Sequence, residues 1–184
     1  YSVSIGPYAF YQCNAITNLN LPDSMSNSFD EYAFADCSSL VLSSKISASR
    51  IGPHAFDGST YTNLVIDCRN IGAYAFKPRG IARSCSINNF VKRNYVTINE
   101  YAFSGVTIKS VCDFTGGTIG PHAFEGCAFT QKIEFDQVTI GLRSFAEISP
   151  AANSKIKFLS TSVGERAFQN IQVLISLNFD CKVV

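Results

Sequence analysis

The chain has 184 residues, of which 46% are hydrophobic and 16% charged, and its formal net charge at pH 7 is +1. Ample apolar content with few charges is typical of a folded chain and not of a disordered one. No apolar run approaches the roughly 18 residues that a transmembrane helix needs, and the basic excess typical of nucleic-acid-binding domains is missing.

One six-residue phrase recurs eight times along the chain. In order it reads IGPYAF (5–10), FDEYAF (29–34), IGPHAF (51–56), IGAYAF (71–76), INEYAF (98–103), IGPHAF (119–124), IGLRSF (140–145) and VGERAF (163–168). The phenylalanines that close successive phrases are 24, 22, 20, 27, 21, 21 and 23 residues apart. Self-similarity at such a period indicates a solenoid, in which each repeat packs against its neighbours.

Between the phrases, two apolar residues flank a single residue. These pairs are Leu19/Leu21, Leu40/Leu42, Leu64/Ile66, Cys85/Ile87, Cys112/Phe114, Ile133/Phe135, Ile156/Phe158 and Leu177/Phe179. Alternation with period two predicts a strand with one buried face. The Ile-Gly pair predicts a turn, because glycine accepts backbone conformations that other residues avoid, and the following x-x-Ala-Phe predicts one helical turn. The residue three positions after each phenylalanine is small or apolar, with Arg79 the exception, and is expected to be buried.

One repeat alone has too few apolar side chains to close a core, so stacking must bury them. We therefore predict a β-rich repeat solenoid with a ladder of parallel strands, phenylalanines behind it, and short helical or 3-10 turns on the opposite side. We expect residues 1–184 to form a single solenoid of about eight repeats. We also expect it to belong to a longer array, with neighbouring repeats or caps as partners.

The segment from Ile5 to Pro22 follows the pattern I-G-x-x-A-F-x-x-C-x-x-L-x-x-L-x-L-P, with isoleucine at the first leucine position. This pattern resembles the BspA-like class of leucine-rich repeat, and the resemblance extends over the whole chain. It implies a leucine-rich-repeat solenoid of the kind found mostly on surfaces of bacteria and mucosal parasitic protists. It further implies a role in adhesion and host-protein binding without enzymatic activity.

The two histidines, His54 and His122, both occupy the fourth position of the phrase. The other members of that column are tyrosine or arginine, so we interpret the histidines as planar side chains that cover an apolar surface. No nucleophile stands out near either one, and neither has a metal-ligand spacing. We expect no catalytic residue, no metal and no cofactor.

The seven cysteines contain no CxxC pair. Cys13, Cys37 and Cys127 share the column after the phenylalanine, while Cys85 and Cys112 are assigned to a strand column. Neighbouring strands are close enough for a disulfide, but equivalent side chains in a ladder run parallel to each other. We therefore expect buried, unpaired thiols that act as small hydrophobic side chains.

The outward position between the paired apolar residues is the candidate binding surface. Its column is Asn20, Val41, Val65, Ser86, Asp113, Glu134, Lys157 and Asn178. Asp113 and Glu134 would be neighbours, but an acid/base pair needs a cleft and one raised pKa. We therefore predict a solvated recognition face for a protein or glycan ligand, with the polar members of the column as binding residues.

A basic cluster in the longest repeat is the alternative site. It comprises Lys77, Arg79, Arg83, Lys92 and Arg93, with no acidic residue from Cys68 to Asn99. It is either a solvated insertion or a site for an acidic partner such as a sulfated glycan.

Two function classes remain open: a cell-surface or extracellular adhesion module, which the resemblance favours, and an intracellular scaffold that binds a partner on the same face. The first residues lack the basic and apolar regions of a signal peptide, which fits a mature chain, an internal fragment or an unexported protein. None of the thirteen asparagines lies in an N-x-[ST] sequon, which favours a source other than the eukaryotic secretory pathway. The compartment therefore stays open at this point.

Overall fold

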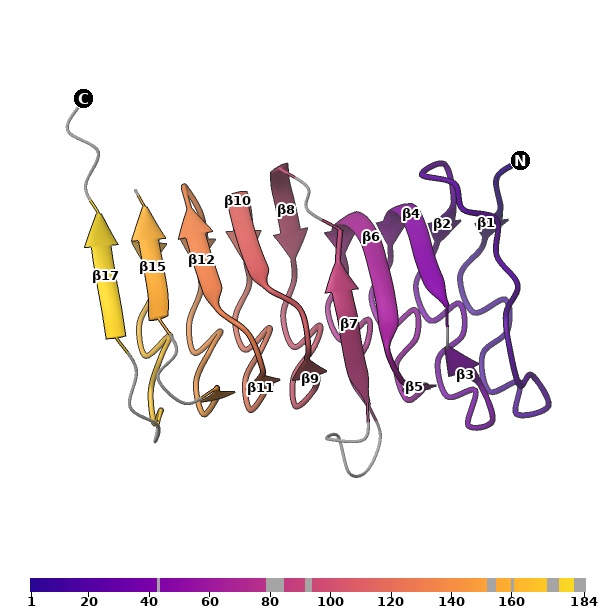
Figure 1. Cartoon of the computed structure of the whole chain (residues 1–184). Coiled ribbons are helices and arrows are strands. Elements are labelled where there is room, and N and C mark those ends of the chain that lie inside the picture. The colour runs from indigo at the N-terminus through magenta and orange to yellow at the C-terminus, as the bar shows by residue number, and fades with distance from the viewer. Residues whose placement is uncertain are drawn as a thin grey trace.

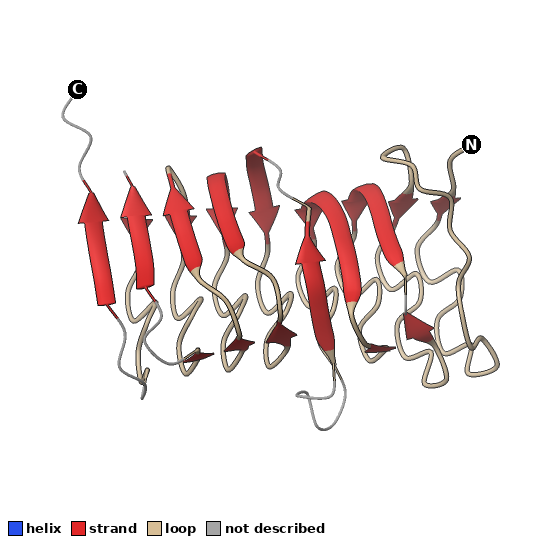
Figure 2. Cartoon of the chain, in the orientation of Figure 1, coloured by secondary structure: helices blue, strands red, loops and turns tan. Residues whose placement is uncertain are grey.

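The structure is a computed structural model that describes residues 1–42, 44–78, 85–91, 94–151, 155–159, 161–171 and 176–180. Successive repeats coil along one axis, with residues 4–5 and 176–180 at opposite ends (Figure 1). Within the described residues the regular secondary structure consists of strands, joined by turns and loops (Figure 2). The predicted parallel solenoid is confirmed.

The strands form three rows. The front row is β4 (Lys45–Ile51), β6 (Leu64–Ile71), β7 (Ser86–Phe90), β10 (Cys112–Ile119), β12 (Ile133–Asp136), β15 (Lys155–Leu159) and β17 (Ser176–Asp180). A second row leads into the phrase turns and contains β1 (Ser4–Ile5), β2 (Ser28–Phe29), β8 (Asn94–Ile98), β13 (Thr139–Ile140), β16 (Ser162–Val163) and the ends of β4, β6 and β10. A third row follows the turns and contains β3 (Val41–Leu42), β5 (Thr60–Tyr61), β9 (Thr107–Ile108), β11 (Ala128–Phe129) and β14 (Ser149–Pro150). β3 and β5 form a two-stranded sheet, and the other strands form one sheet of 15.

The front strands of repeats five to eight keep the predicted register. Cys112, Ile133, Ile156 and Leu177 are aligned across β10, β12, β15 and β17, and so are Phe114, Phe135, Phe158 and Phe179. Rings of the second set stack at centroid distances of 5.7, 5.4 and 4.9 Å. Except for the last strand, these side chains are buried. Alternation in the sequence therefore identified the inward face correctly in this half.

The phrase itself forms a turn, and the helical turn predicted for x-x-Ala-Phe is replaced by a different backbone. The fourth phrase residue is left-handed in all eight repeats, with φ between 50° and 59°. A left-handed residue interrupts an α- or 3-10 helix, because both need negative φ throughout. The second residue after the phenylalanine is also left-handed in most repeats, for example Gln12, Asp36 and Gly58.

Backbone hydrogen bonds connect each phrase turn to the next one. In the first repeat Tyr8, Phe10 and Gln12 donate their N–H groups to the carbonyls of Glu31, Ala33 and Ala35 at 2.9 Å. The same three donors recur at every junction except the one after Phe76, where the third position is Pro78. Proline has no N–H to donate and its φ is fixed near −65°. Repeat four therefore has two of these bonds instead of three.

From the third repeat on, the phrase glycines serve close approach of two backbones instead of the unusual backbone conformation expected from the sequence. A Cβ on Gly72 would lie 2.4 Å from the carbonyl carbon of Gly52 in the preceding repeat. Neither glycine has a positive φ, since that conformation is found at the fourth phrase position.

The phrase phenylalanines form the predicted ladder, with stacked rings 4.9–5.6 Å apart from Phe10 to Phe168. The six inner members are buried, whereas Phe10 at one end is 37% exposed and Phe168 is partly buried. The expectation that all eight lie in the core is thus wrong at Phe10, because a terminal ring has a neighbouring ring on one side only.

Candidate binding face

The outward surface of the front row is called the front face. In β10 and β12 buried residues alternate with partly exposed ones, so every second side chain points outward. Asp113 is paired with Glu134, Glu134 with Lys157, and Lys157 with Asn178. Four of the predicted binding residues therefore lie on adjacent strands in one row, about 4.8 Å apart. Glu134 also forms an ion pair with Lys132 at 3.0 Å.

The row has a second part nearer the N-terminus. Here Lys45 is paired with Val65, and Val65 with Asn89. Lys45 Nζ lies 3.0 Å from Asp23 Oδ1 and 3.3 Å from Asp67 Oδ2. A hydrogen bond from Ser47 and the ammonium of Lys45 lower the pKa of Asp23, and Asp23 in turn raises the pKa of Lys45. This end of the front face is thus an ionised network.

Three predicted members of the column need comment. Ser86 is wrong, because its side chain is 5% exposed, is paired with Thr107 and accepts a hydrogen bond from the Asn63 N–H at 3.0 Å. Val41 is also wrong, because β3 pairs with β5 in the third row and Lys45 takes its place on the front face. Asn20 is exposed, but it lies outside the assigned strands.

These errors have one cause. The corner, which is the segment that joins a third-row strand to the following front-row strand, varies in length from repeat to repeat. The apolar residues of these two strands also look alike in sequence. In repeat two the front apolar residues are Ile46 and Ala48, and Leu42 belongs to the third row. In repeat four they are Ile87 and Phe90.

Only Lys77 of the basic cluster can be placed. Its Nζ lies 4.9 Å from the ring centroid of Tyr74 and 5.1 Å from that of Tyr101, which is the geometry of a cation–π contact. Lys77 therefore covers the phrase turns and not the front face. Arg79, Arg83, Lys92 and Arg93 lie outside the described residues.

Repeat four changes the front row. Between Leu64 and Val65 the register with β7 shifts, so that Val65 faces Asn89 and Ile66 faces Phe90. Within the described residues β7 pairs with β6 and β9, whereas β10 pairs with β8, β12 and β13. β7 and β10 follow one another along the axis, and yet they form no ladder.

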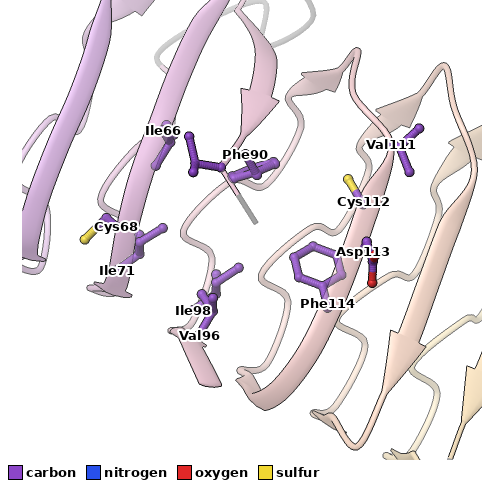
Figure 3. A pocket seen from close by; sticks show the side chains of 11 residues that line it. Ile66, Cys68, Ile71, Phe90, Val96, Ile98, Val111, Cys112, Asp113 and Phe114 are labelled. Atoms are coloured by element: carbon purple, nitrogen blue, oxygen red, sulfur yellow. The ribbon is translucent and has the colours of Figure 1, made fainter. Parts of the chain in front are cut away.

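A cavity of about 50 Å³ lies where this ladder is interrupted. Figure 3 shows the side chains of β6, β8 and β10 that surround it, with Phe90 between those of β6 and β10. We call this site the notch; its lining is Ile66, Cys68, Ile71, Phe90, Val91, Val96, Ile98, Val111, Cys112, Asp113 and Phe114. Sequence reasoning missed it. The available signal was the spacing of three residues from Ile87 to Phe90, against six from Ile108 to Phe114 in the next repeat.

The two histidines belong to a stacked column of fourth phrase residues, as predicted. Ring centroids are 4.4–5.0 Å apart through Tyr8, Tyr32, His54, Tyr74, Tyr101 and His122. His54 Nδ1 is 2.8 Å from Asp57 Oδ2, and His122 Nδ1 is 2.8 Å from Glu125 Oε2.

Glu125 is the centre of a charged group at the end of this column. Its Oε1 accepts hydrogen bonds from Arg143 Nη2 at 2.6 Å and Nε at 3.0 Å. Burial by itself raises the pKa of Glu125, but the hydrogen bonds and charges of Arg143 and His122 outweigh it and lower that pKa. The carboxylate is therefore held in its ionised form.

Among the described residues the six cysteines form no disulfide with one another, and five of the six are buried. Cys37 and Cys127 donate Sγ–H to the carbonyls of Phe10 and Phe103 in the preceding repeat, both at 3.0 Å. Cys85 lies in the same column after the phenylalanine, between Ser59 of the preceding repeat and Val106 of the following one. The hydrogen bond from the Thr107 N–H to the Cys85 carbonyl places it there. The prediction that Cys85 lies in a strand column was therefore wrong. Cys85 occupies the buried position that the sequence pattern had assigned to Arg79 in repeat four.

Burial raises the pKa of the Cys37, Cys68, Cys112 and Cys127 thiols. It raises the pKa of Cys68 to about 11 and that of Cys112 to about 12, and that of Cys127 further still. Thiols with such values are poor nucleophiles near neutral pH. Within the described ranges no group of three or more His, Cys, Asp or Glu side chains is placed to hold a metal ion.

Among the described residues no helix is long and apolar enough to cross a membrane. A scan against family models matches residues 3–111 and 81–184 to the BspA type leucine-rich repeat region, a model of six copies. Searches of curated proteins and of solved structures give no match. With the phrase turns, the parallel rows and a family match from end to end, the chain belongs to the BspA-type leucine-rich-repeat family.

Proposed function

We propose that the chain is a non-enzymatic binding module at the cell surface, which contacts a protein partner through the front face. The observation that carries this proposal is the in-register row of Asp113, Glu134, Lys157 and Asn178 on adjacent strands. Rigid sheet positions need little ordering upon binding. Membership in a leucine-rich-repeat family supports protein binding, and the resemblance to surface proteins of this class supports adhesion.

Binding without catalysis agrees with the chemistry of this row. Its two carboxylates lie side by side on the adjacent strands β10 and β12, and Glu134 is ion-paired with Lys132 at 3.0 Å. An acid/base pair works with one protonated member in a cleft. Charges of both signs on a firm surface instead favour recognition of a partner with the complementary pattern.

The test is a binding screen of the purified chain against immobilised extracellular-matrix proteins and a glycan array. A hit is then measured with the triple variant D113K/E134K/K157E. Because these side chains point outward, the variant is expected to keep its melting temperature and to lose at least tenfold in affinity. The control K77E/R79E/R83E reverses three charges of the basic cluster and is expected to bind within about threefold of the wild type.

The opposite pattern would overturn the proposal: normal binding by the front-face variant and loss in the control would assign the site to the basic insertion. A hit on sulfated glycans alone would replace a protein ligand with a glycan. Antibody labelling of intact source cells tests the surface location, and labelling only after permeabilisation would contradict it.

A further inference from the structure

The notch divides the front-face row into two parts. On one side lie Lys45, Val65 and Asn89, and on the other side Asp113, Glu134, Lys157 and Asn178. Asp113 belongs both to the row and to the lining of the notch. A partner that lies across the front strands therefore passes over the notch.

The size and lining of the notch restrict what can enter it. Its volume is about 50 Å³, whereas small-molecule sites measure roughly 300–1,000 Å³. Most of its lining is apolar, with Phe90 and Phe114 among the larger side chains and Asp113 the one charged member. A sugar hydroxyl would lose hydrogen bonds to water there without regaining them. One aliphatic side chain fits this combination of volume and polarity.

The rim completes the description. Val111 is 43% exposed and lines the notch, so apolar surface continues from the cavity to the front face. Beyond it the members of the row are polar or charged, with Val65 the one exception. An apolar pocket within a polar surround is the arrangement typical of an interface hot spot, where one anchor side chain contributes most of the affinity.

We propose that the notch receives a single aliphatic side chain (valine, leucine or isoleucine) from the protein that binds the front face. This anchor rests on the proposed front-face function and specifies its partner: a segment with one aliphatic side chain between polar residues. The contact adds affinity because atoms that line a void gain dispersion contacts when it is filled.

A first experiment probes the notch without a partner. Methyl NMR spectra of the wild-type chain are recorded under increasing pressure of xenon, an apolar atom that enters apolar cavities. Saturable shifts are expected for Ile66, Ile71 and Val96, and not for Ile133 or Ile140 of the regular repeats. V96L, which adds one carbon at the lining, is expected to abolish these shifts. Shifts of similar size in all five residues, or in none, would overturn the notch as a binding site.

A second experiment uses random twelve-residue peptides displayed on phage and selected on the wild-type chain. The selected peptides are expected to share one aliphatic residue whose replacement by alanine weakens binding 10- to 100-fold. V111E is expected to weaken binding to the same degree. The matched control is V41E, because Val41 has the same 43% exposure but lies in the third row; it is expected to bind within twofold of the wild type. Equal losses for V111E and V41E would overturn the proposal.

The same peptides separate this inference from the proposed function. If D113K/E134K/K157E loses binding while V96L and V111E retain it, the front face is the site and the notch proposal is wrong. If V96L and V111E lose binding while the triple variant retains it, the notch stands and the extended front-face site is wrong.

Discussion

Repeats four and six carry nearly the same phrase and yet build different front strands. In repeat six the turn makes three hydrogen bonds to the next turn, and β12 pairs with both neighbours. In repeat four Pro78 removes one of those bonds, a register shift follows in β7, and the ladder to β10 is missing among the described residues. Even so, the Phe76 and Phe103 rings stack at 5.3 Å, as in the regular repeats.

This difference shows that the phrase turn keeps the same structure in both repeats, whereas the front strand changes its pairing. The phrase turn is held by ring stacking, by buried alanines and by bonds from the preceding repeat. The front strand is held by pairing and ring stacking with its neighbours, but the length of its corner decides which residues enter that register. An insertion in one repeat can therefore change the front face without disturbing the phenylalanine ladder behind it, which separates the variable front surface from the regular packing of the turns.

The largest expected effect comes from the regular ladder. Phe124→Ala removes a fully buried ring that contacts Phe103 and Phe145, and it should lower the free energy of unfolding by about 3–5 kcal/mol. Phe90→Ala, at the notch, should cost less than half as much, because that ring is partly exposed and borders a cavity. Urea denaturation measures both losses. Equal losses would show that repeat four is packed as tightly as repeat six.

Tyr74→Ala provides the control for the inward column. Tyr74 is partly exposed in the stacked column, so its truncation should cost clearly less than Phe124→Ala. A loss as large as that of Phe124→Ala would mean that the phenylalanine column does not dominate the core.

The next effect is a loss of folding stability at acidic pH. The pKa of Glu125 is lower in the folded chain than in the unfolded one, where it is near 4.5. Its contribution to stability is therefore complete above the unfolded pKa and is lost as the pH falls through the folded pKa. E125Q should cost about 1–2 kcal/mol at pH 7, below the ~1.5–3 kcal/mol of well-buried charged hydrogen bonds. Thermal unfolding from pH 7 to 2.5 should show a smaller acid loss in E125Q than in the wild type; identical pH profiles would contradict this role.

Thiol reactivity should distinguish the two regions with a smaller effect. Near pH 8, Cys13 should be alkylated first because it is partly exposed. Cys112, which lines the notch, should follow, and Cys127 should be slowest within the regular column. Mass spectrometry after timed iodoacetamide treatment measures the order. In denaturant without reductant all seven cysteines should react, and fewer than six would reveal a disulfide.

The smallest expected effect lies on the front face. Glu134→Lys breaks an ion pair with Lys132 whose two side chains are 35% and 54% exposed. Exposed pairs contribute about 0–1 kcal/mol, so the melting temperature should change little, as differential scanning calorimetry would show. A drop comparable to that of Phe124→Ala would mean that this carboxylate has a structural role.

Much of this architecture could be predicted from the phrase, because a strict motif fixes the register of everything close to it. Ser86, Val41 and Cys85 were misplaced because they follow corners of variable length, where several apolar residues fit the same pattern. The left-handed backbone at Tyr8 and its equivalents could not be predicted either, because a positive φ is uncommon in residues other than glycine. The notch depends on a ladder that does not form, and a missing pairing leaves little trace in sequence.

The bonds between phrase turns have a further electrostatic consequence. Up to three N–H groups of each turn point to the following repeat, whereas bonds in the front row run both ways, for example from Val91 back to Ile66 and from Cys112 forward to Lys132. Aligned peptide groups add their dipoles, as in an α-helix. The turn columns therefore form an axial dipole with its negative pole towards Tyr8 and its positive pole towards Arg166, which is opposite in sense to a helix. A cation near the first turn, or an anion near the last, is stabilised by this field.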